Sequence, residues 1–196
     1  MYVPSWQAWF GHIPNDAIDS IIKTCDTFPL EDALLGSDTE EYPGHTNDEW
    51  RRSKVAFIPP YMPETTLLTA GIASKANEAN RNAWGFNIGP QIYDIQYTKY
   101  YGTDKGFYNW HIDTFFANNS RAFDRKISVI IQLSDSDEYE GGDFKLDPEI
   151  EQPDPIQMRK KGTVIVFPSY LRHMVEPVTS GERKSIVSWI EGPRFV

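Results

Sequence analysis

The chain has 196 residues, of which 40% are hydrophobic and 24% are charged, as is typical of a globular protein. No run of 18 consecutive apolar residues occurs, so no membrane span is expected, and the N-terminus lacks the basic and apolar regions of a secretory signal. Cys25 is the single cysteine, which excludes an intrachain disulfide and fits a reducing compartment. These features predict a cytoplasmic protein.

The net charge of −9 is unevenly distributed along the chain. Residues 135–154 carry nine acidic side chains and one lysine, and residues 31–49 carry seven acidic side chains and no basic one. Proteins that bind the phosphate backbone of nucleic acids usually carry a net positive charge, so nucleic acid is a disfavoured partner. The acidic runs are either solvated loops or rims beside a site for a cationic or peptide substrate.

The first 90 residues are predicted to form helices and loops. Apolar residues recur at i, i+3, i+4 and i+7 between Ile18 and Cys25, which predicts a helix, and prolines at 14 and 29 bound this segment. A second helix is expected after Pro63, with a buried stripe from Leu68 to Ala83. Both helices are expected to cover one face of a sheet.

From residue 91 the hydrophobic period changes to 2, which indicates strands. The predicted strands are 92–100, 107–113, 126–133, 142–146, 162–167, 172–176 and 184–190. Short strands separated by turn signals predict a mainly β protein with a sandwich or jelly-roll fold. One domain is expected, with a helical and loop layer over residues 1–90 and a β core over residues 91–196.

Three candidate metal ligands lie on two of these strands. His111 and Asp113 are two residues apart, so they point to the same face of a strand. His173 lies on a later strand that a sandwich can bring opposite this pair. Two imidazoles and one carboxylate leave coordination positions open and are typical of non-haem Fe(II) sites, while zinc is the competing metal.

Arg183 is the candidate receptor for a carboxylate. Arg183, Ser185, Val187 and Trp189 share one face of a predicted strand, and the apolar members indicate that this face is turned inward. A buried guanidinium needs an anion, and its fork matches two carboxylate oxygens. A dicarboxylate cosubstrate would provide that anion.

Several motifs resemble a known family. The run from His173 to Trp189, with Pro177, Gly181 and Arg183 between them, resembles the C-terminal signature of prolyl 4-hydroxylase-type Fe(II)/2-oxoglutarate dioxygenases. Upstream, three further segments resemble family motifs: YGTDKGFYNWHID at 101–113, EGGDF at 140–144 and KGTVIVF at 161–167. The resemblance covers residues 92–191.

This resemblance implies a double-stranded β-helix and a set of site residues. His111, Asp113 and His173 would be the catalytic Fe(II) ligands. The cosubstrate 2-oxoglutarate would be bound by Arg183, with Ser185, Tyr101 and Gln132 beside it. Tyr108 and Trp189 would lie nearer the substrate. Tyr108 has the opposite strand parity to His111, so a bulge or turn must intervene if both face the site.

The implied reaction is hydroxylation of a substrate, with a prolyl residue in a protein or peptide favoured, coupled to decarboxylation of 2-oxoglutarate to succinate and CO₂. The implied cofactors are Fe(II), 2-oxoglutarate and O₂, with ascorbate as a further candidate. Two alternatives stay open: the same chemistry on a free amino acid, small metabolite or nucleobase, and a non-catalytic jelly-roll module that binds a metal or carboxylate. The loops expected to select the substrate are 114–125 and 135–157.

Overall fold

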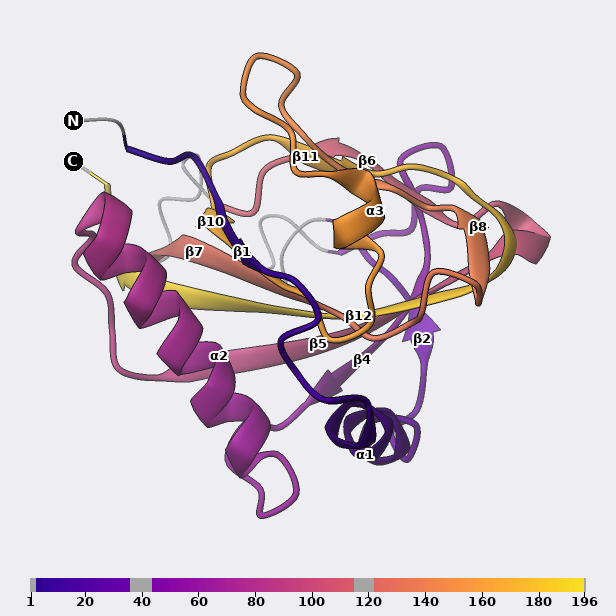
Figure 1. Ribbon diagram of the computed structural model, residues 1–196, viewed down its shortest axis with the longest axis horizontal. Coiled ribbons are helices and arrows are strands. Elements are labelled where there is room, and N and C mark those ends of the chain that lie inside the picture. The colour runs from indigo at the N-terminus through magenta and orange to yellow at the C-terminus, as the bar shows by residue number, and fades with distance from the viewer. Residues whose placement is uncertain (1–2, 36–43, 115–121, 196) are drawn as a thin grey trace.

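The computed structural model describes residues 3–35, 44–114 and 122–195 (Figure 1). Three α-helices are found in these ranges: α1 (Asn15–Cys25), α2 (Thr66–Ala79) and the one-turn α3 (Pro155–Met158). The N-terminal strands are β1 (Gln7–Trp9), β2 (Glu31–Asp32), β3 (Arg51–Arg52) and β4 (Lys54–Ile58). The later strands are β5 (Ile92–Tyr101), β6 (Phe107–His111), β7 (Phe123–Gln132), β8 (Tyr139–Gly141), β9 (Phe144–Leu146), β10 (Val164–Pro168), β11 (His173–Val175) and β12 (Val178–Pro193).

Two antiparallel sheets form the fold, as the predicted jelly roll requires. The larger sheet has the order β1-β10-β7-β12-β5-β4-β2, with β8 also paired to β12, and the smaller sheet has the order β3-β6-β11-β9. Apart from β4 and β5, the neighbouring strands in both sheets are non-consecutive in the sequence. The fold class predicted from the sequence is therefore confirmed.

The prediction of only helices and loops in the first 90 residues is wrong in one respect. The segment also supplies β1, β2 and β4 to the larger sheet and β3 to the smaller one. These strands are two to five residues long. Runs this short show too few alternating positions for a period of 2 to be visible in the sequence.

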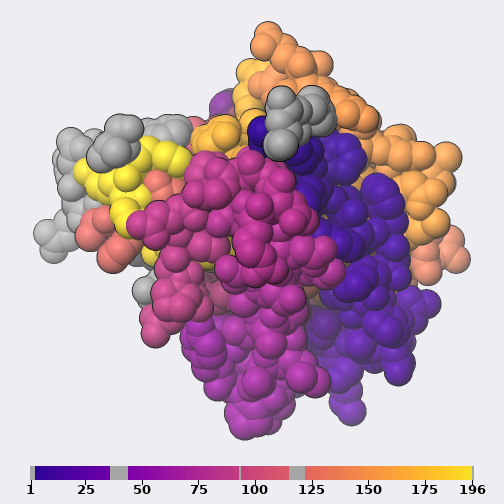
Figure 2. Space-filling model, turned by 60° about the vertical axis from the view of Figure 1, so that its left-hand side comes forward, coloured from indigo at the N-terminus to yellow at the C-terminus, as the bar shows by residue number. Residues whose placement is uncertain are grey.

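The two predicted helices are present and cover the outer face of the larger sheet. Apolar side chains of both helices, such as Ile18 and Ile72, pack in one core with Ile127, Val129 and Ile131 of β7. Figure 2 shows this face covered by the N-terminal segments coloured indigo and magenta. In the described part of the chain, none of the helices combines the length and apolarity that a membrane crossing requires.

A second apolar core lies between the two sheets. Ile165 and Phe167 of the larger sheet pack there with Phe144, Leu146 and Val175 of the smaller sheet. Alternation along β7 sends Ser128, Ile130 and Gln132 to this inner side. Polar side chains on an otherwise apolar inner face indicate where a site lies.

Candidate active site

The three candidate metal ligands converge between the sheets. Strands β6 and β11 are neighbours, and His111 lies directly opposite His173 in their register. Asp113 follows β6, and its backbone N–H donates a 2.9 Å hydrogen bond to the carbonyl of Ser169. One ligand atom from each of the three side chains lies within 4.8 Å of the others. The structure therefore brings together the triad predicted from the sequence.

Backbone carbonyls fix the orientation of both imidazoles. Nδ1 of His111 lies 2.7 Å from the carbonyl oxygen of Asn109, and Nδ1 of His173 lies 2.9 Å from that of Leu171. A carbonyl oxygen only accepts, so each Nδ1 carries the proton and each Nε2 keeps its lone pair. The two Nε2 atoms lie 3.7 and 3.5 Å from the carboxylate oxygens of Asp113. This is the arrangement expected of metal-ligating histidines.

The carboxylate of Asp113 is buried and held by a hydroxyl pair. The hydroxyl of Ser128 donates a 2.6 Å hydrogen bond to Oδ2, and it lies 2.9 Å from the hydroxyl of Ser169. Burial would raise the pKa of Asp113, but His173, His111 and the Ser128 hydrogen bond together hold it below its ordinary value. The side chain is therefore ionised, as a metal ligand must be.

The His111 imidazole is kept neutral by its surroundings. Burial, followed by the neighbouring His173, lowers the pKa of His111 from 6.5 to about 3. Two oriented nitrogen lone pairs and one carboxylate oxygen suit a divalent metal ion with open coordination positions. The residues present therefore fit an Fe(II) ion bound by His111, Asp113 and His173.

Arg183 occupies the position predicted for a carboxylate receptor. Its side chain is 3% exposed, and its Nη1 lies 3.5 Å from the hydroxyl of Ser185. None of the described carboxylates forms an ion pair with it. A buried guanidinium without a negative partner is costly, so this pocket is suited to an anionic ligand.

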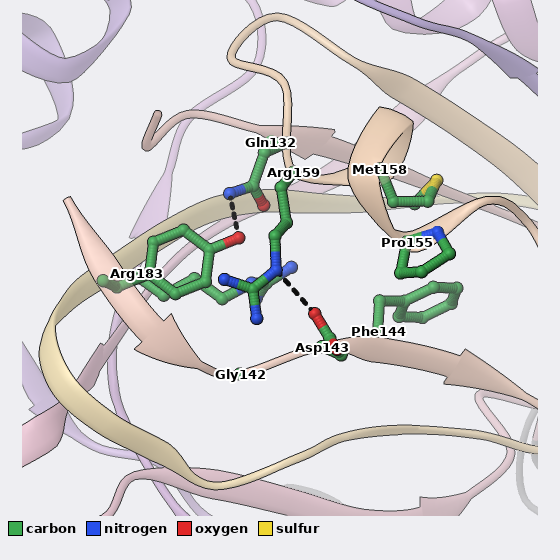
Figure 3. A pocket seen from close by; sticks show the side chains of 9 residues that line it. Gln132, Gly142, Asp143, Phe144, Pro155, Met158, Arg159 and Arg183 are labelled. Atoms are coloured by element: carbon green, nitrogen blue, oxygen red, sulfur yellow. Dashed lines mark hydrogen bonds and ion pairs between the residues drawn. The ribbon is translucent and has the colours of Figure 1, made fainter. Parts of the chain in front are cut away.

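The pocket around Arg183 is lined by further polar groups (Figure 3). Gln132 lies opposite Ser185 in the register of β7 and β12, and its Nε2 donates a 3.0 Å hydrogen bond to the hydroxyl of Tyr139. The structure thus brings Gln132 and Ser185 to Arg183, as predicted. Tyr139 was not predicted, because its place beside Gln132 depends on the pairing of β8 with β12.

Tyr101 lies away from this pocket. In the pairing of β5 with β12, Tyr100 is opposite Arg183, whereas Tyr101 is opposite Glu182. Successive residues of a strand point to opposite faces, so Tyr100 and not Tyr101 shares the face of Arg183. The guanidinium of Arg183 lies 5.5 Å from the ring centroid of Tyr100.

Tyr108 lies directly against a metal ligand. Its ring stacks on the imidazole of His111, with centroids 3.5 Å apart and planes inclined by 13°. The register shift between β6 and β11 places His173 opposite His111 but Val175 opposite Tyr108, which confirms the predicted bulge. Burial raises the pKa of Tyr108 to about 12, so its phenol remains protonated.

Two arginines line the same end of the site. The guanidinium of Arg51 lies 4.3 Å from the ring centroid of Tyr108, its Nε donates to the hydroxyl of Ser53, and its Nη2 has no hydrogen-bond partner among the described residues. The guanidinium of Arg125 lies 3.6 Å from the ring centroid of Trp189, which is buried opposite Ser128. Arg51 was missed because it adjoins an acidic loop, where the sequence shows only a charged segment.

The fold and the site together define a domain of the Fe(II)- and 2-oxoglutarate-dependent oxygenase class. Residues 95–191 match the family profile described as the 2OG-Fe(II) oxygenase superfamily. This part of the chain contains all three candidate metal ligands and Arg183. The matched part of the chain is therefore a 2OG-Fe(II) oxygenase domain.

Similar curated proteins are PKHD-type hydroxylases of bacteria. One from Synechococcus sp. strain CC9605 is 39% identical over 84 residues, covering 43% of this chain and 36% of the relative. One from Prochlorococcus marinus strain SARG is 33% identical over 107 residues, covering 54% of this chain and 45% of the relative. The matched part thus spans less than half the length of these relatives.

Solved structures share the fold over almost the whole chain. A Pseudomonas putida prolyl-4-hydroxylase aligns with a TM-score of 0.69 at 18% identity, covering 98% of this chain and 94% of that one. A Trichoplax adhaerens prolyl hydroxylase, solved in complex with a hypoxia inducible factor peptide fragment, aligns with a TM-score of 0.71 at 16% identity, covering 95% and 83%. The N-terminal segment outside the family match is therefore part of the shared fold.

Proposed function

We propose that this protein hydroxylates a prolyl residue in a protein or peptide and couples this reaction to decarboxylation of 2-oxoglutarate to succinate and CO₂. The observation that carries the proposal is the convergence of His111, Asp113 and His173 between the sheets, together with a buried Arg183 on the inner face of the larger sheet that forms no ion pair with a described carboxylate. Fe(II), when bound, supplies the activation of O₂. Ascorbate stays an expectation from the family resemblance.

The protein's part in this reaction is to hold the ion and its cosubstrate. His111, Asp113 and His173 offer three deprotonated ligand atoms and leave the other positions for cosubstrate and O₂. The guanidinium of Arg183 and the hydroxyl of Ser185 would bind the distal carboxylate of 2-oxoglutarate. A dicarboxylate thus supplies the negative charge that Arg183 lacks.

The groups on the Tyr108 side support a peptide substrate. Nη2 of Arg51 has no hydrogen-bond partner among the described residues, so it is a buried donor that a substrate carbonyl can accept from. The ring of Tyr108 lies between His111 and Arg51 and that of Trp189 lies under Arg125, so these rings form the wall on this side of the site. Trp50 and Ile112 adjoin the site and are 41% and 42% exposed, so the mouth has apolar surface for neighbouring substrate residues. The PKHD-type relatives and the peptide-bound neighbour support the same assignment.

The test begins with anaerobic titration of metal-free protein with Fe(II) and then 2-oxoglutarate. We expect a visible charge-transfer band that disappears in His111→Ala and weakens in Arg183→Ala. The loaded enzyme is then offered proline-containing peptides, free proline and nucleosides, and mass spectrometry records a gain of one oxygen. If neither Fe(II) nor 2-oxoglutarate binds, the oxygenase assignment is wrong, and a non-catalytic jelly-roll module is the remaining assignment. Turnover of only small molecules would overturn the prolyl-peptide assignment.

A further inference from the structure

A small cavity lies between Arg183, α3 and the segment that runs from β8 to β9 (Tyr139–Leu146), called the β8–β9 segment below (Figure 3). Arg183 and Gln132 of the larger sheet line one side of it. The other side is lined by groups of the β8–β9 segment and α3, among them Gly142, Asp143, Met158 and Arg159. The β8–β9 segment and α3 therefore cover, on this side, the side chains that would hold the cosubstrate carboxylate.

The Arg159 side chain fastens α3 to the β8–β9 segment. Its Nε donates a 2.7 Å hydrogen bond to Oδ1 of Asp143, and its Nη2 donates a 2.6 Å hydrogen bond to the carbonyl of Gly141. The guanidinium also lies 5.0 Å from the ring centroid of Tyr139. One side chain thus contacts an acid, a carbonyl and a ring at three positions of the same segment.

The segment that carries Arg159 is itself fixed on both sides. The Asp154 carboxylate accepts hydrogen bonds from the backbone N–H groups of Ile156 and Gln157 at the start of α3. After α3, Lys161 forms a 2.6 Å ion pair with Asp19 of α1. These contacts hold the backbone on both sides of Arg159 in place, so its side chain lies against the β8–β9 segment in a defined position.

The β8–β9 segment that Arg159 fastens is in close contact with the carboxylate receptor. A Cβ atom on Gly142 would lie 3.2 Å from Cδ of Arg183 and 3.3 Å from the ring of Tyr139. Any outward movement of this segment would therefore enlarge the space around Arg183. The charge of Arg159 is offset by Asp143, so an entering carboxylate is directed to Arg183, which has no carboxylate partner among the described residues.

We propose that Arg159, through its pair with Asp143, sets the length of the 2-oxo diacid that the Arg183 pocket accepts. This inference rests on the proposed function, because it assigns a residue to the cosubstrate of that reaction. With the β8–β9 segment fastened, Tyr139 and Arg159 line the pocket beside Arg183, so we expect no room there for a diacid with one more methylene. A single methylene changes binding in a confined pocket by about 10-fold or more.

The test compares 2-oxoglutarate with 2-oxoadipate, which is one methylene longer. Isothermal titration calorimetry of the Fe(II)-loaded, anaerobic protein gives both dissociation constants without turnover. The wild type should bind 2-oxoglutarate at least about 10-fold more tightly. Arg159→Ala and Asp143→Ala should each reduce this ratio several-fold, mainly by improving the binding of 2-oxoadipate.

Lys54→Ala is the control, because it removes a cation that is paired with Asp32 on β4 and β2 and does not line the cavity. It should keep the wild-type ratio. If Arg159→Ala does not fold, the same affinity ratio is measured for Asp143→Asn, which weakens the Arg159–Asp143 pair with little change of side-chain shape. A wild-type ratio near one, or an unchanged ratio in the folded variants, would overturn the inference. Failure of the wild type to bind either acid would instead overturn the proposed function.

Discussion

The hydroxyl of Ser128, on β7 of the larger sheet, donates a 2.6 Å hydrogen bond to Oδ2 of Asp113, which follows β6 of the smaller sheet. Ser128 is in turn held by the hydroxyl of Ser169, whose backbone carbonyl accepts the N–H of Asp113. The two serines thus fix both the backbone and the carboxylate of the one acidic ligand. This relationship gives Ser128 a positioning role that does not require contact with the metal.

Replacing Ser128 by alanine should weaken Fe(II) binding by about 10- to 100-fold, because the carboxylate loses the group that orients it. Anaerobic Fe(II) titration followed by calorimetry measures the change. Ser188→Ala is the matched control, since Ser188 is equally buried but its hydroxyl donates to the carbonyl of Asp94. Equal Fe(II) affinities of Ser128→Ala and wild type would rule out the positioning role.

Substitution of Arg183 should affect the cosubstrate and spare the metal. Arg183→Gln removes the charge and the fork, and we expect 2-oxoglutarate binding to weaken by about 100-fold or more. Arg183→Lys keeps the charge but lacks the two-pronged guanidinium, so its 2-oxoglutarate affinity should lie between those of the wild type and Arg183→Gln. Calorimetry gives the cosubstrate affinity, and Fe(II) titration should give wild-type values for both variants. A parallel loss of Fe(II) binding would mean that Arg183 supports the fold instead.

Much of the site is visible in the sequence because its residues carry local signals. His111 and Asp113 can be recognised from their spacing of two residues on one predicted strand. Arg183 can be recognised because it shares one face of a predicted strand with apolar residues. The bulge in β6 was predicted from the parity of Tyr108 and His111, and the structure has it. These inferences need only the period of a strand and the chemistry of the side chains.

The remaining contacts depend on which strands pair and in what register. Ser128 reaches Asp113, and Arg51 reaches Tyr108, only through pairings that the sequence does not encode locally. Whether Tyr100 or Tyr101 faces Arg183 depends on the register of β5 against β12, and a shift of one residue would exchange them. The short strands β1–β4 were missed for a related reason, since their partners lie far along the chain.

Arg51 should contribute to substrate binding alone. Arg51→Gln removes the charged donor next to Tyr108, so KM for a peptide substrate should rise by about 10-fold while 2-oxoglutarate affinity is unchanged. Steady-state kinetics and calorimetry provide the two readings. Arg52→Gln is the control, because this neighbouring arginine instead donates to the carbonyl of Asp104 and stacks on Phe107. An effect of equal size in Arg52→Gln would indicate a general loss of charge.

Adding one methyl group at Gly142 should disturb the cosubstrate pocket. Gly142 has φ +65°, and a Cβ there would lie 2.8 Å from Cγ2 of Val178 and 3.2 Å from Cδ of Arg183. Gly142→Ala should therefore destabilise the fold by about 1–3 kcal/mol and weaken 2-oxoglutarate binding. Gly71→Ala is the opposite case, because nothing lies within 4 Å of its added Cβ in α2. It should stabilise the protein by up to about 1 kcal/mol in the same urea unfolding series.

The buried triad predicts how stability of the metal-free protein changes with acidity. The pKa of His111 falls from 6.5 to about 3 on folding, so between these values the unfolded chain binds a proton that the folded protein excludes. The pKa of Asp113 is also lowered, which acts in the same direction at lower pH. Stability should therefore fall as pH decreases below 6.5, by up to about 1.4 kcal/mol per pH unit for each such group. Urea unfolding of the metal-free protein at pH 7.5, 6.5 and 5.5 measures this slope. His111→Phe should show a shallower slope, and a slope identical to that of the wild type would contradict the assignment.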